Sequence, residues 1–381
     1  MEKTFADFFA GIGLVRLGLE RADWRPAFAI DIDQKKFEMY HDAFPCDSLG
    51  AYVVDDIYKL DPARVPTVAL AWASFPCTDL SLAGSRGGLS SGESSAFFGF
   101  LEVLDGMRHR LPQIVVLENV PGFVSSSRGQ DFRAAIQELN CLGYVCDAFV
   151  LDAIRFVPQS RARLFIVGTI GVTPTEDPLG SLLRRPEALA PAKVFEAIAA
   201  NHDLKWTIRD LPNPPPPQRR GLLDILERLP LNDSRWWPSS RADYLLSQMS
   251  PRHQKVMQAL IQSDRTTAAT VYRRVRNGKT KAELRADDVA GCLRTPKGGS
   301  SRQIVIFAGG GQYRVRFMTP REYARLMGAK DYPISVGDNQ AYFGFGDAVC
   351  VPAIEWIAHN YLEGLVQSVS HRTKPRQMVP L

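Results

Sequence analysis

The sequence predicts an α/β fold built on a largely parallel sheet, with a second, irregular domain inserted after it. From residue 1 to about 168, short apolar segments alternate with amphipathic ones in the order strand, helix, strand. After Gly168 the composition changes, with prolines at Pro214–Pro217 and a basic segment over Tyr272–Arg285. A chain of 381 residues is long enough for two domains.

Periodicity and capping signals place the individual elements of this fold. The helix expected near the end of the chain begins with a Thr319 cap and has Pro320 in its first position. The predicted strands are Phe5–Phe9, Pro26–Ile30, Val68–Ala73, Ile114–Leu117 and Leu164–Val167. The predicted helices are Leu14–Arg21, Gln34–Phe44, Phe98–Arg110, Phe132–Leu142, Thr319–Met327 and Ala353–Leu362.

The composition is that of an ordinary soluble protein, with 45% hydrophobic and 23% charged residues. No apolar run approaches the roughly 20 residues of a membrane helix, and the N-terminus has no cleavage-site pattern, so neither a membrane span nor a targeting signal is expected. The six cysteines form no CxxC pair, which predicts no metal site and favours a reducing cytoplasm. A net charge of +5 permits a nucleic-acid partner without requiring one.

The segment Asp7–Gly13 ends a strand and opens a helix. Glycine there lets backbone N–H groups approach a ligand at a helix N-terminus, although a tight turn without a ligand would have the same sequence. The next strand ends in Asp31, which is well placed to hold ribose hydroxyls, with a solvated helix cap as the alternative. Asp55 and Asp56 add acids suited to an adenine amino group. Together these residues indicate an adenosine-bearing cofactor.

Cys77 follows the strand Val68–Ala73, at the sheet edge where such folds have their active sites. A lone cysteine is more often a small buried residue, but Glu118 ends the next strand and gives the thiol a carboxylate partner at the same edge. A thiol and a carboxylate suit covalent attack on an electron-poor ring. Arg161 and Arg163 add cations that can bind a phosphate or a carbonyl oxygen, although such a run is usually a solvated loop.

The ordered set DFFAGIG, DID, DDI, FPC, ENVPGF, PQSRAR and QAYFGFGDAV resembles the DNA cytosine-5 methyltransferase family, of the bacterial restriction–modification or related defence type. The resemblance covers about residues 1–168 and 313–362. It implies a Rossmann-like methyltransferase domain that uses S-adenosylmethionine, releases S-adenosylhomocysteine, and carries an inserted target-recognition domain. The domains expected are 1–170 (catalytic, first part), 171–310 (target recognition), 311–366 (catalytic, closing part) and 367–381 (loose tail).

Site roles follow from the same resemblance, residue by residue. Cys77 matches the nucleophile that adds to cytosine C6, Glu118 the residue that contacts N3 and N4, and Arg163 the arginine that contacts the base. Arg161 is grouped with these catalytic residues. The positions expected to bind the cofactor are Phe9, Ala10, Gly11, Ile12, Gly13, Asp31, Ile32, Asp56, Ile57, Pro76, Thr78, Asp347, Ala348 and Val349.

Addition at C6 and methyl transfer to C5 require the cytosine to be flipped out of the duplex, so contacts to double-stranded DNA must offset a cost of a few kcal/mol. Two basic stretches are candidates, with a solvated surface helix as the alternative for the first. The resemblance implies a monomer in the cytoplasm, beside the bacterial nucleoid, and allows a cognate restriction or defence system. The candidate DNA-binding residues are Arg273, Arg274, Arg276, Lys279 and Lys281, then Arg294, Lys297, Ser300 and Arg302.

Two positions depart from the family pattern at the reacting centre. Thr78 replaces the usual Gln after the nucleophile, and Asp347 replaces the usual Asn after Gly346. Three interpretations remain open: unchanged chemistry, a roomier pocket for a bulkier sulfonium cofactor, or impaired activity because Asp347 repels the methionine carboxylate. An RNA-directed methyltransferase and a non-catalytic DNA-binding homologue are alternatives for the whole chain; the insert of about 140 residues favours DNA.

Overall fold

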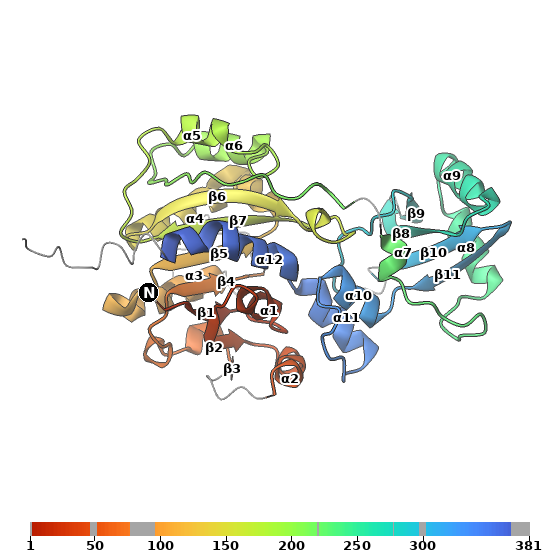
Figure 1. Ribbon diagram of the computed structural model, residues 1–381, viewed down its shortest axis with the longest axis horizontal. Coiled ribbons are helices and arrows are strands. Elements are labelled where there is room, and N and C mark those ends of the chain that lie inside the picture. Colours follow the sequence, from red (N-terminus) through yellow and green to blue (C-terminus); the bar gives the residue numbers. More distant parts are fainter. Residues whose placement is uncertain are drawn as a thin grey trace, which may run out of the picture.

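A seven-stranded sheet forms the larger of two packing units in the computed structural model, which describes residues 2–45, 52–76, 96–218, 221–276, 278–296 and 302–366 (Figure 1). The strand order is β3-β2-β1-β4-β5-β7-β6, and β7 runs antiparallel to both of its neighbours. The other pairings are parallel, which confirms the predicted α/β class. The strands are β1 (Thr4–Phe8), β2 (Arg25–Asp31), β3 (Tyr52–Val54), β4 (Leu70–Ala73), β5 (Ile114–Asn119), β6 (Val145–Asp152) and β7 (Ala162–Thr169).

Helices cover both faces of this sheet because its central strands are apolar on both sides. In β4, Leu70 and Trp72 join one core while Ala71 and Ala73 join the other, as expected for a buried parallel strand. Helices α1 and α12 pack over the first core, and α3, α4 and α6 over the second. Their bounds are α1 (Leu14–Glu20), α2 (Gln34–Ala43), α3 (Ala96–Met107), α4 (Gln130–Cys141), α5 (Pro178–Arg184), α6 (Ala192–Ala199) and α12 (Val351–Ile357).

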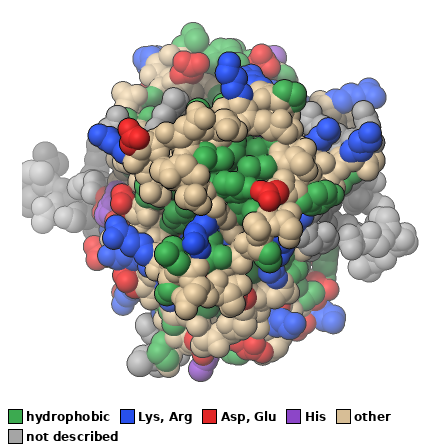
Figure 2. Space-filling model, turned by 90° about the vertical axis from the view of Figure 1, so that its right-hand side faces the viewer, with side chains coloured by type: hydrophobic (Ala, Val, Ile, Leu, Met, Phe, Trp, Pro, Cys, Tyr) green, Lys and Arg blue, Asp and Glu red, His purple; other side chains and the backbone are tan. Residues whose placement is uncertain are grey.

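The smaller unit contains a four-stranded antiparallel sheet in the order β11-β10-β8-β9, so the inserted domain has a more regular core than the sequence suggested. One face packs against α8 and α9, with Met257, Val271 and Ile306 among the buried residues. Figure 2 shows the end of the molecule at this unit: apolar side chains gather in a central hollow, with most Lys and Arg side chains toward the rim. The elements are α8 (Ser239–Ser247), α9 (Pro251–Gln262), β8 (Thr267–Arg276), β9 (Lys279–Arg285), β10 (Ile304–Gly309) and β11 (Gln312–Phe317).

The two packing units do not divide at residues 170 and 310, where the sequence placed the domain boundaries. Leu182 and Trp206 belong to the core of the larger unit, and Arg185 forms a buried ion pair with Asp147 of β6, at 2.8 Å. At the other end, β11 completes the second sheet and extends it to Phe317. The change in composition after Gly168 therefore precedes the structural transition, because the α5–α6 segment packs on the first sheet.

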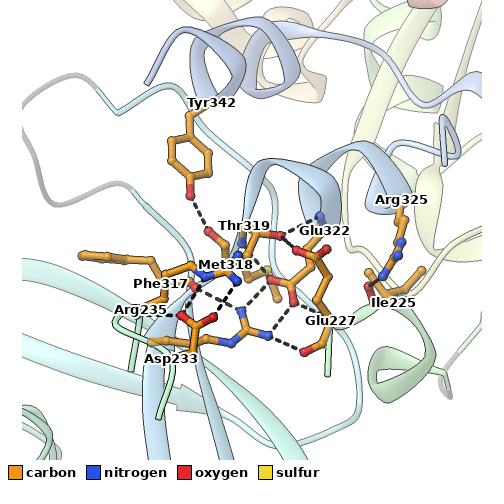
Figure 3. A network of polar contacts seen from close by, with 11 residues as sticks. Ile225, Glu227, Asp233, Arg235, Phe317, Met318, Thr319, Glu322, Arg325 and Tyr342 are labelled. Carbon is orange, nitrogen blue, oxygen red and sulfur yellow. Dashed lines mark hydrogen bonds and ion pairs between the residues drawn. The ribbon is translucent and has the colours of Figure 1, made fainter. Parts of the chain in front are cut away.

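A buried polar network joins the second sheet to the helices that follow it (Figure 3). Arg316 donates to Glu322 Oε1 and Oε2 at 2.5 and 2.8 Å, and both side chains are fully buried. Thr319 caps α10 with Glu322 in a capping box and Pro320 in the first turn, which confirms the predicted start of this helix. The helices here are α7 (Leu222–Ile225), α10 (Pro320–Leu326) and α11 (Asp338–Asp347).

Candidate active site

A glycine loop connects β1 to α1, and its backbone needs glycine. Gly11 and Gly13 have φ angles of 56° and 81°, in the left-handed region. A Cβ on Gly13 would lie 2.6 Å from a Phe44 ring carbon and 2.8 Å from one of Tyr40. Phe9, in the same loop, also has a positive φ of 61°. The side chains of Ala10 and Ile12 are buried, so the loop presents mainly backbone to a ligand.

Asp31 at the end of β2 anchors this loop. Its Oδ2 accepts a hydrogen bond from Gly11 N at 2.9 Å, and its Oδ1 accepts one from Asp33 N at 3.0 Å. Each carboxylate oxygen keeps a second lone pair for a ligand hydroxyl. The next residue, Ile32, is an apolar side chain that is 69% exposed, which suits a flat ring stacked on it. Tyr52 was not among the site residues predicted from the sequence, and its hydroxyl donates to Gly11 O at 3.0 Å.

The acidic turn after β3 contains a polar capping residue, Asp56, and a buried apolar residue, Ile57. Asp56 caps the 3-10 turn Ile57–Lys59, and its Oδ1 accepts from Tyr58 N at 3.1 Å. Ile57 is buried, and a Cβ on Gly99 of α3 would lie 2.7 Å from its Cγ2. Ile57 is therefore a core residue that holds the turn in place, and Asp56 is the polar side chain of the pair.

The segment leading to the nucleophile is tied to the neighbouring strand end. Phe75 O accepts a hydrogen bond from Asn119 Nδ2 at 3.3 Å, and Ser74 N donates to Phe8 O at 3.3 Å. Glu118 precedes Asn119 at the end of β5 and is 6% exposed. The exposed Pro76 ends the described segment, and Cys77 and Thr78 lie outside the described residues. The end of the chain segment before Cys77 and the carboxylate of Glu118 thus share one edge of the sheet.

Arg163 pairs directly with Glu118. Its Nε lies 2.9 Å from Glu118 Oε1, with 16% and 8% of the two side chains exposed. The antiparallel β7 makes this contact possible, because Arg163 lies at the end of β7 that meets the carboxyl end of β5. Two residues far apart in the sequence thereby form one partly buried ion pair beside the segment that leads to Cys77.

Arg161, by contrast, is almost fully buried. It is 3% exposed, and Nη1 donates to Leu293 O at 2.9 Å while Nη2 donates to Gly346 O and Ala348 O at 3.2 and 2.6 Å. Burial lowers its pKa, as does the neighbouring Arg163. Its guanidinium is therefore held by backbone carbonyls from two other segments, and the expected catalytic role of Arg161 stays a prediction.

A second cysteine, which the sequence analysis missed, lies beside the two arginines. Arg161 Nη1 donates to Cys292 Sγ at 3.3 Å. Burial alone would raise the pKa of the Cys292 thiol, but Arg161 and Arg163 reverse the effect and lower it. The spacing of the six cysteines does not distinguish Cys292 from the others, so only the fold shows that it lies beside the two arginines.

The closing segment around Asp347 packs against the glycine loop. A Cβ on Gly344 of α11 would lie 2.8 Å from Met39 Sδ and 2.9 Å from Ile12 Cγ2. Asp347 Oδ2 lies 3.2 Å from Lys36 Nζ. Ala348 is partly exposed, whereas Val349 is buried in the core. A hollow of about 700 Å³ lies between α2 and α11, lined by Asp33, Lys35, Lys36, Met39, Phe343 and Gly344 among others.

The candidate DNA-binding residues occupy a hairpin and a segment beside the closing helix. The first group lies on β8 and β9, which rules out the surface helix considered as its alternative. There Lys279 and Lys281 are exposed, Arg273 is partly buried, and Arg274 Nε is 3.1 Å from Glu283 Oε2. The side chain of Arg276, together with Lys297 and Ser300, lies outside the described residues.

In the second group, Arg294 is exposed and its backbone lies against the closing segment, since a Cβ on Gly346 would be 2.7 Å from the Arg294 carbonyl carbon. Arg302 lies over the Tyr342 ring, 4.8 Å from its centroid, and donates to Asn339 Oδ1 at 3.1 Å. Its guanidinium is therefore engaged with α11. Of the two residues of this group that the structure describes, Arg294 is the exposed one, and its backbone lies beside Gly346.

The ranges that the structure describes contain neither a candidate metal site nor a candidate membrane-spanning helix. They contain no cluster of three or more His, Cys, Asp or Glu arranged to hold a metal ion. None of their helices is both long and apolar enough to cross a membrane.

The reversed seventh strand, the glycine loop and the acid that ends β2 define a Rossmann-like methyltransferase. The C-5 cytosine-specific DNA methylase family model matches residues 3–363, and the chain belongs to this family. It is a DNA cytosine-5 methyltransferase. The type II methyltransferase M.NlaX of Neisseria lactamica is 28% identical over 96% of this chain and 98% of its own length. M.HpaII of Haemophilus parainfluenzae is 27% identical, over 95% and 90%.

Solved structures with similar folds include S. pombe Dnmt2, with a TM-score of 0.56, 18% identity and coverage of 97% of this chain and 99% of that one. A methyltransferase of Entamoeba histolytica, EhMeth, has a TM-score of 0.58 and 15% identity, with coverage of 96% and 99%. At these identities the likeness establishes the fold.

Proposed function

We propose that the chain methylates C5 of a cytosine flipped out of a specific sequence in double-stranded DNA, with S-adenosylmethionine as the methyl donor. The observation that carries the proposal is the Glu118–Arg163 ion pair at 2.9 Å, on the sheet edge to which Asn119 ties the segment before Cys77. A nucleophile, a carboxylate and a fixed cation at one edge suit covalent catalysis on a pyrimidine.

The residues around the glycine loop fit an S-adenosyl cofactor. A Cβ on Gly11 would have no neighbour closer than 3.9 Å, Asp31 has lone pairs for ribose hydroxyls, and Ile32 offers an apolar platform for adenine. Asp56 is placed as an acceptor for the adenine amino group. When bound, S-adenosylmethionine supplies an electrophilic methyl group on a sulfonium sulfur.

The chain's own residues then have distinct tasks. The Cys77 thiolate adds to cytosine C6, and Glu118 hydrogen-bonds N3 and N4, which stabilises the electron density that moves into the ring and makes C5 nucleophilic. Arg163 holds the Glu118 carboxylate and lies beside the base. After C5 has gained the methyl group, loss of the C5 proton to water returns the electron pair to the ring and releases Cys77.

We assign target recognition to the second sheet and its helices, between the proline-rich segment and β11. The exposed Lys279 and Lys281 on the β8–β9 hairpin and the exposed Arg294 are suited to phosphate contacts, which do not themselves specify a sequence. Their binding energy would offset the few kcal/mol that base flipping costs. The enzyme is proposed to act as a monomer on cytoplasmic, nucleoid DNA, with or without a cognate restriction or defence system, in line with its type II bacterial relatives.

A covalent trap tests this function against the alternatives. The purified chain is incubated with S-adenosylmethionine and 5-fluorocytosine placed either in duplex DNA or in tRNA, and adducts are resolved on a denaturing gel. Because fluorine at C5 blocks the final elimination, DNA should give an adduct and tRNA none. Cys77→Ala must abolish the adduct. An adduct with tRNA alone would assign the enzyme to RNA, and none with either would indicate a non-catalytic homologue.

Replacing Asp31 tests the cofactor site directly. Asp31→Ala should weaken S-adenosylhomocysteine binding about 10- to 100-fold, since a hydrogen bond to a charged group contributes about 1.5–3 kcal/mol. The measurement is isothermal titration calorimetry. Asp61→Ala is the matched control, because Asp61 also accepts a backbone N–H, from Ala63, but lies on an exposed turn. Equal affinities for the two variants would contradict the assigned role of Asp31.

A further inference from the structure

Lys36 lies in the first turn of α2, where the helix dipole disfavours a cation by about 0.3–1 kcal/mol. Burial also acts to lower its pKa, but the charges of Asp31, Asp347 and Asp33 outweigh burial and raise the pKa. The ammonium group is therefore held in its charged form by the acids around it. Lys36 thus remains charged at a helix position that disfavours a cation, and this points to a role for it in binding an anionic group.

The geometry places Lys36 between the closing segment and the glycine loop. Its Nζ lies 3.2 Å from Asp347 Oδ2, with 19% of the lysine side chain and 51% of the aspartate side chain exposed. A Cβ on Gly11 would lie 3.9 Å from Lys36 Cδ, so the lysine stem runs beside the glycine loop. Lys36 also lines the 700 Å³ hollow between α2 and α11.

Asp347 is held in a fixed position by its neighbours. The carbonyl oxygens of Gly346 and Ala348, on either side of it, both accept from Arg161 Nη2. These contacts fix the backbone on both sides of Asp347, and its carboxylate lies 3.2 Å from Lys36 Nζ. An anion fixed at this place would repel an anionic ligand unless a cation compensates it, and Lys36 is the cation in contact with it.

We propose that Lys36 binds the α-carboxylate of the cofactor's amino-acid end, and that Asp347 accepts from the adjacent α-ammonium. The inference rests on the proposed use of S-adenosylmethionine. In the absence of cofactor the two side chains satisfy each other, and on binding each takes the opposite charge of the zwitterion. The half-exposed Asp347 makes this exchange inexpensive in desolvation, and both new contacts are charge-assisted hydrogen bonds. Lys36 thereby offsets the repulsion that Asp347 alone would exert on the ligand carboxylate.

The test compares two ligands that differ only in the amino-acid end. S-adenosylhomocysteine carries that end, and 5′-methylthioadenosine lacks it; both are titrated calorimetrically into the full chain. Lys36→Met should weaken S-adenosylhomocysteine binding about 10- to 100-fold, by the usual contribution of a charged hydrogen bond, and leave 5′-methylthioadenosine binding unchanged. Lys36→Arg should retain most of the affinity. Lys193→Met, on the exposed face of α6, controls for the lost charge.

A second variant separates charge compensation from pocket damage. In Lys36→Met the carboxylate of Asp347 faces the ligand carboxylate without its cation, so adding Asp347→Asn to that variant should recover most of the lost affinity. A merely structural role for Lys36 would give no such recovery. Equal weakening of both ligands by Lys36→Met, or no weakening of either, would overturn the proposal.

Failure of this inference can be told apart from failure of the proposed cofactor. If the unaltered chain binds neither ligand, S-adenosylmethionine is the wrong donor and the role of Lys36 falls with it. If the unaltered chain and Lys36→Met bind S-adenosylhomocysteine equally well, only the role of Lys36 is wrong.

Discussion

Replacing Glu118 with Gln should slow methyl transfer to DNA about 10²- to 10⁴-fold, the range typical of a positioned acid or base. Glu118 is 6% exposed and is paired with Arg163, so the substitution keeps the side-chain shape but removes both the charge and the ability to donate a proton to N3. The Cys77 attack then lacks a group that stabilises charge in the ring. The measurement is single-turnover transfer of a labelled methyl group into duplex DNA.

Cofactor affinity should remain near normal in this variant, because Glu118 lies on β5, which β1 and β4 separate from β2 and Asp31. Glu355→Gln is the matched control, since Glu355 also pairs with an arginine, Arg21, at 3.1 Å on an exposed surface. A Glu118→Gln enzyme as fast as this control would remove Glu118 from the mechanism.

Replacing Arg316 with Met should lower the free energy of unfolding by about 3–5 kcal/mol, the usual result of leaving one charge of a buried pair without its partner. Glu322 is fully buried and accepts two hydrogen bonds from Arg316, which also donates to Glu227 O at 3.1 Å (Figure 3). Without the guanidinium, the Glu322 carboxylate remains desolvated. Urea unfolding at neutral pH measures the loss.

Two further variants show whether the loss of stability comes from the unpaired, buried charge of Glu322. Adding Glu322→Gln to Arg316→Met should recover part of the stability, because the orphaned charge is then removed. Arg235→Met breaks an exposed ion pair with Asp233 in the same network and should change stability little. If the buried and exposed variants lose equal stability, the Arg316–Glu322 pair does not stabilise the junction in the manner described.

Strong hydrophobic periodicity made the larger unit predictable. Ile114–Leu117 is a short apolar run of strand length, and it forms β5. Gln34–Phe44 has the apolar periodicity and the length of a helix, and it forms α2. The edge strand β3 was missed because three residues give too short a pattern. The strand β6 was missed although seven of its eight residues are buried, since a short run without alternation does not distinguish strand from helix.

Site residues were predictable where the chemistry has a motif. Asp31 and Glu118 each end an apolar strand, so topology alone brings them to one sheet edge. Lys36 carried a weaker signal, a cation in the first turn of a helix, that becomes informative only beside Asp347. Arg161 immediately precedes β7 and Arg163 is the second residue of that strand, yet one is buried and the other pairs with Glu118, and the sequence pattern alone cannot tell which.

The network in Figure 3 also constrains how this enzyme can acquire a new DNA target. Glu227, Arg316 and Glu322 contact one another across 95 residues of chain, with the β8–β9 hairpin between them in sequence. Glu227 contacts the other two through its backbone N and O, which any residue but proline provides, whereas Arg316 of the second sheet and Glu322 of α10 form the buried charge pair. A recombination that imported a foreign recognition sheet without Arg316 would leave the Glu322 carboxylate buried and unpaired, so we expect these two positions to change together in related enzymes.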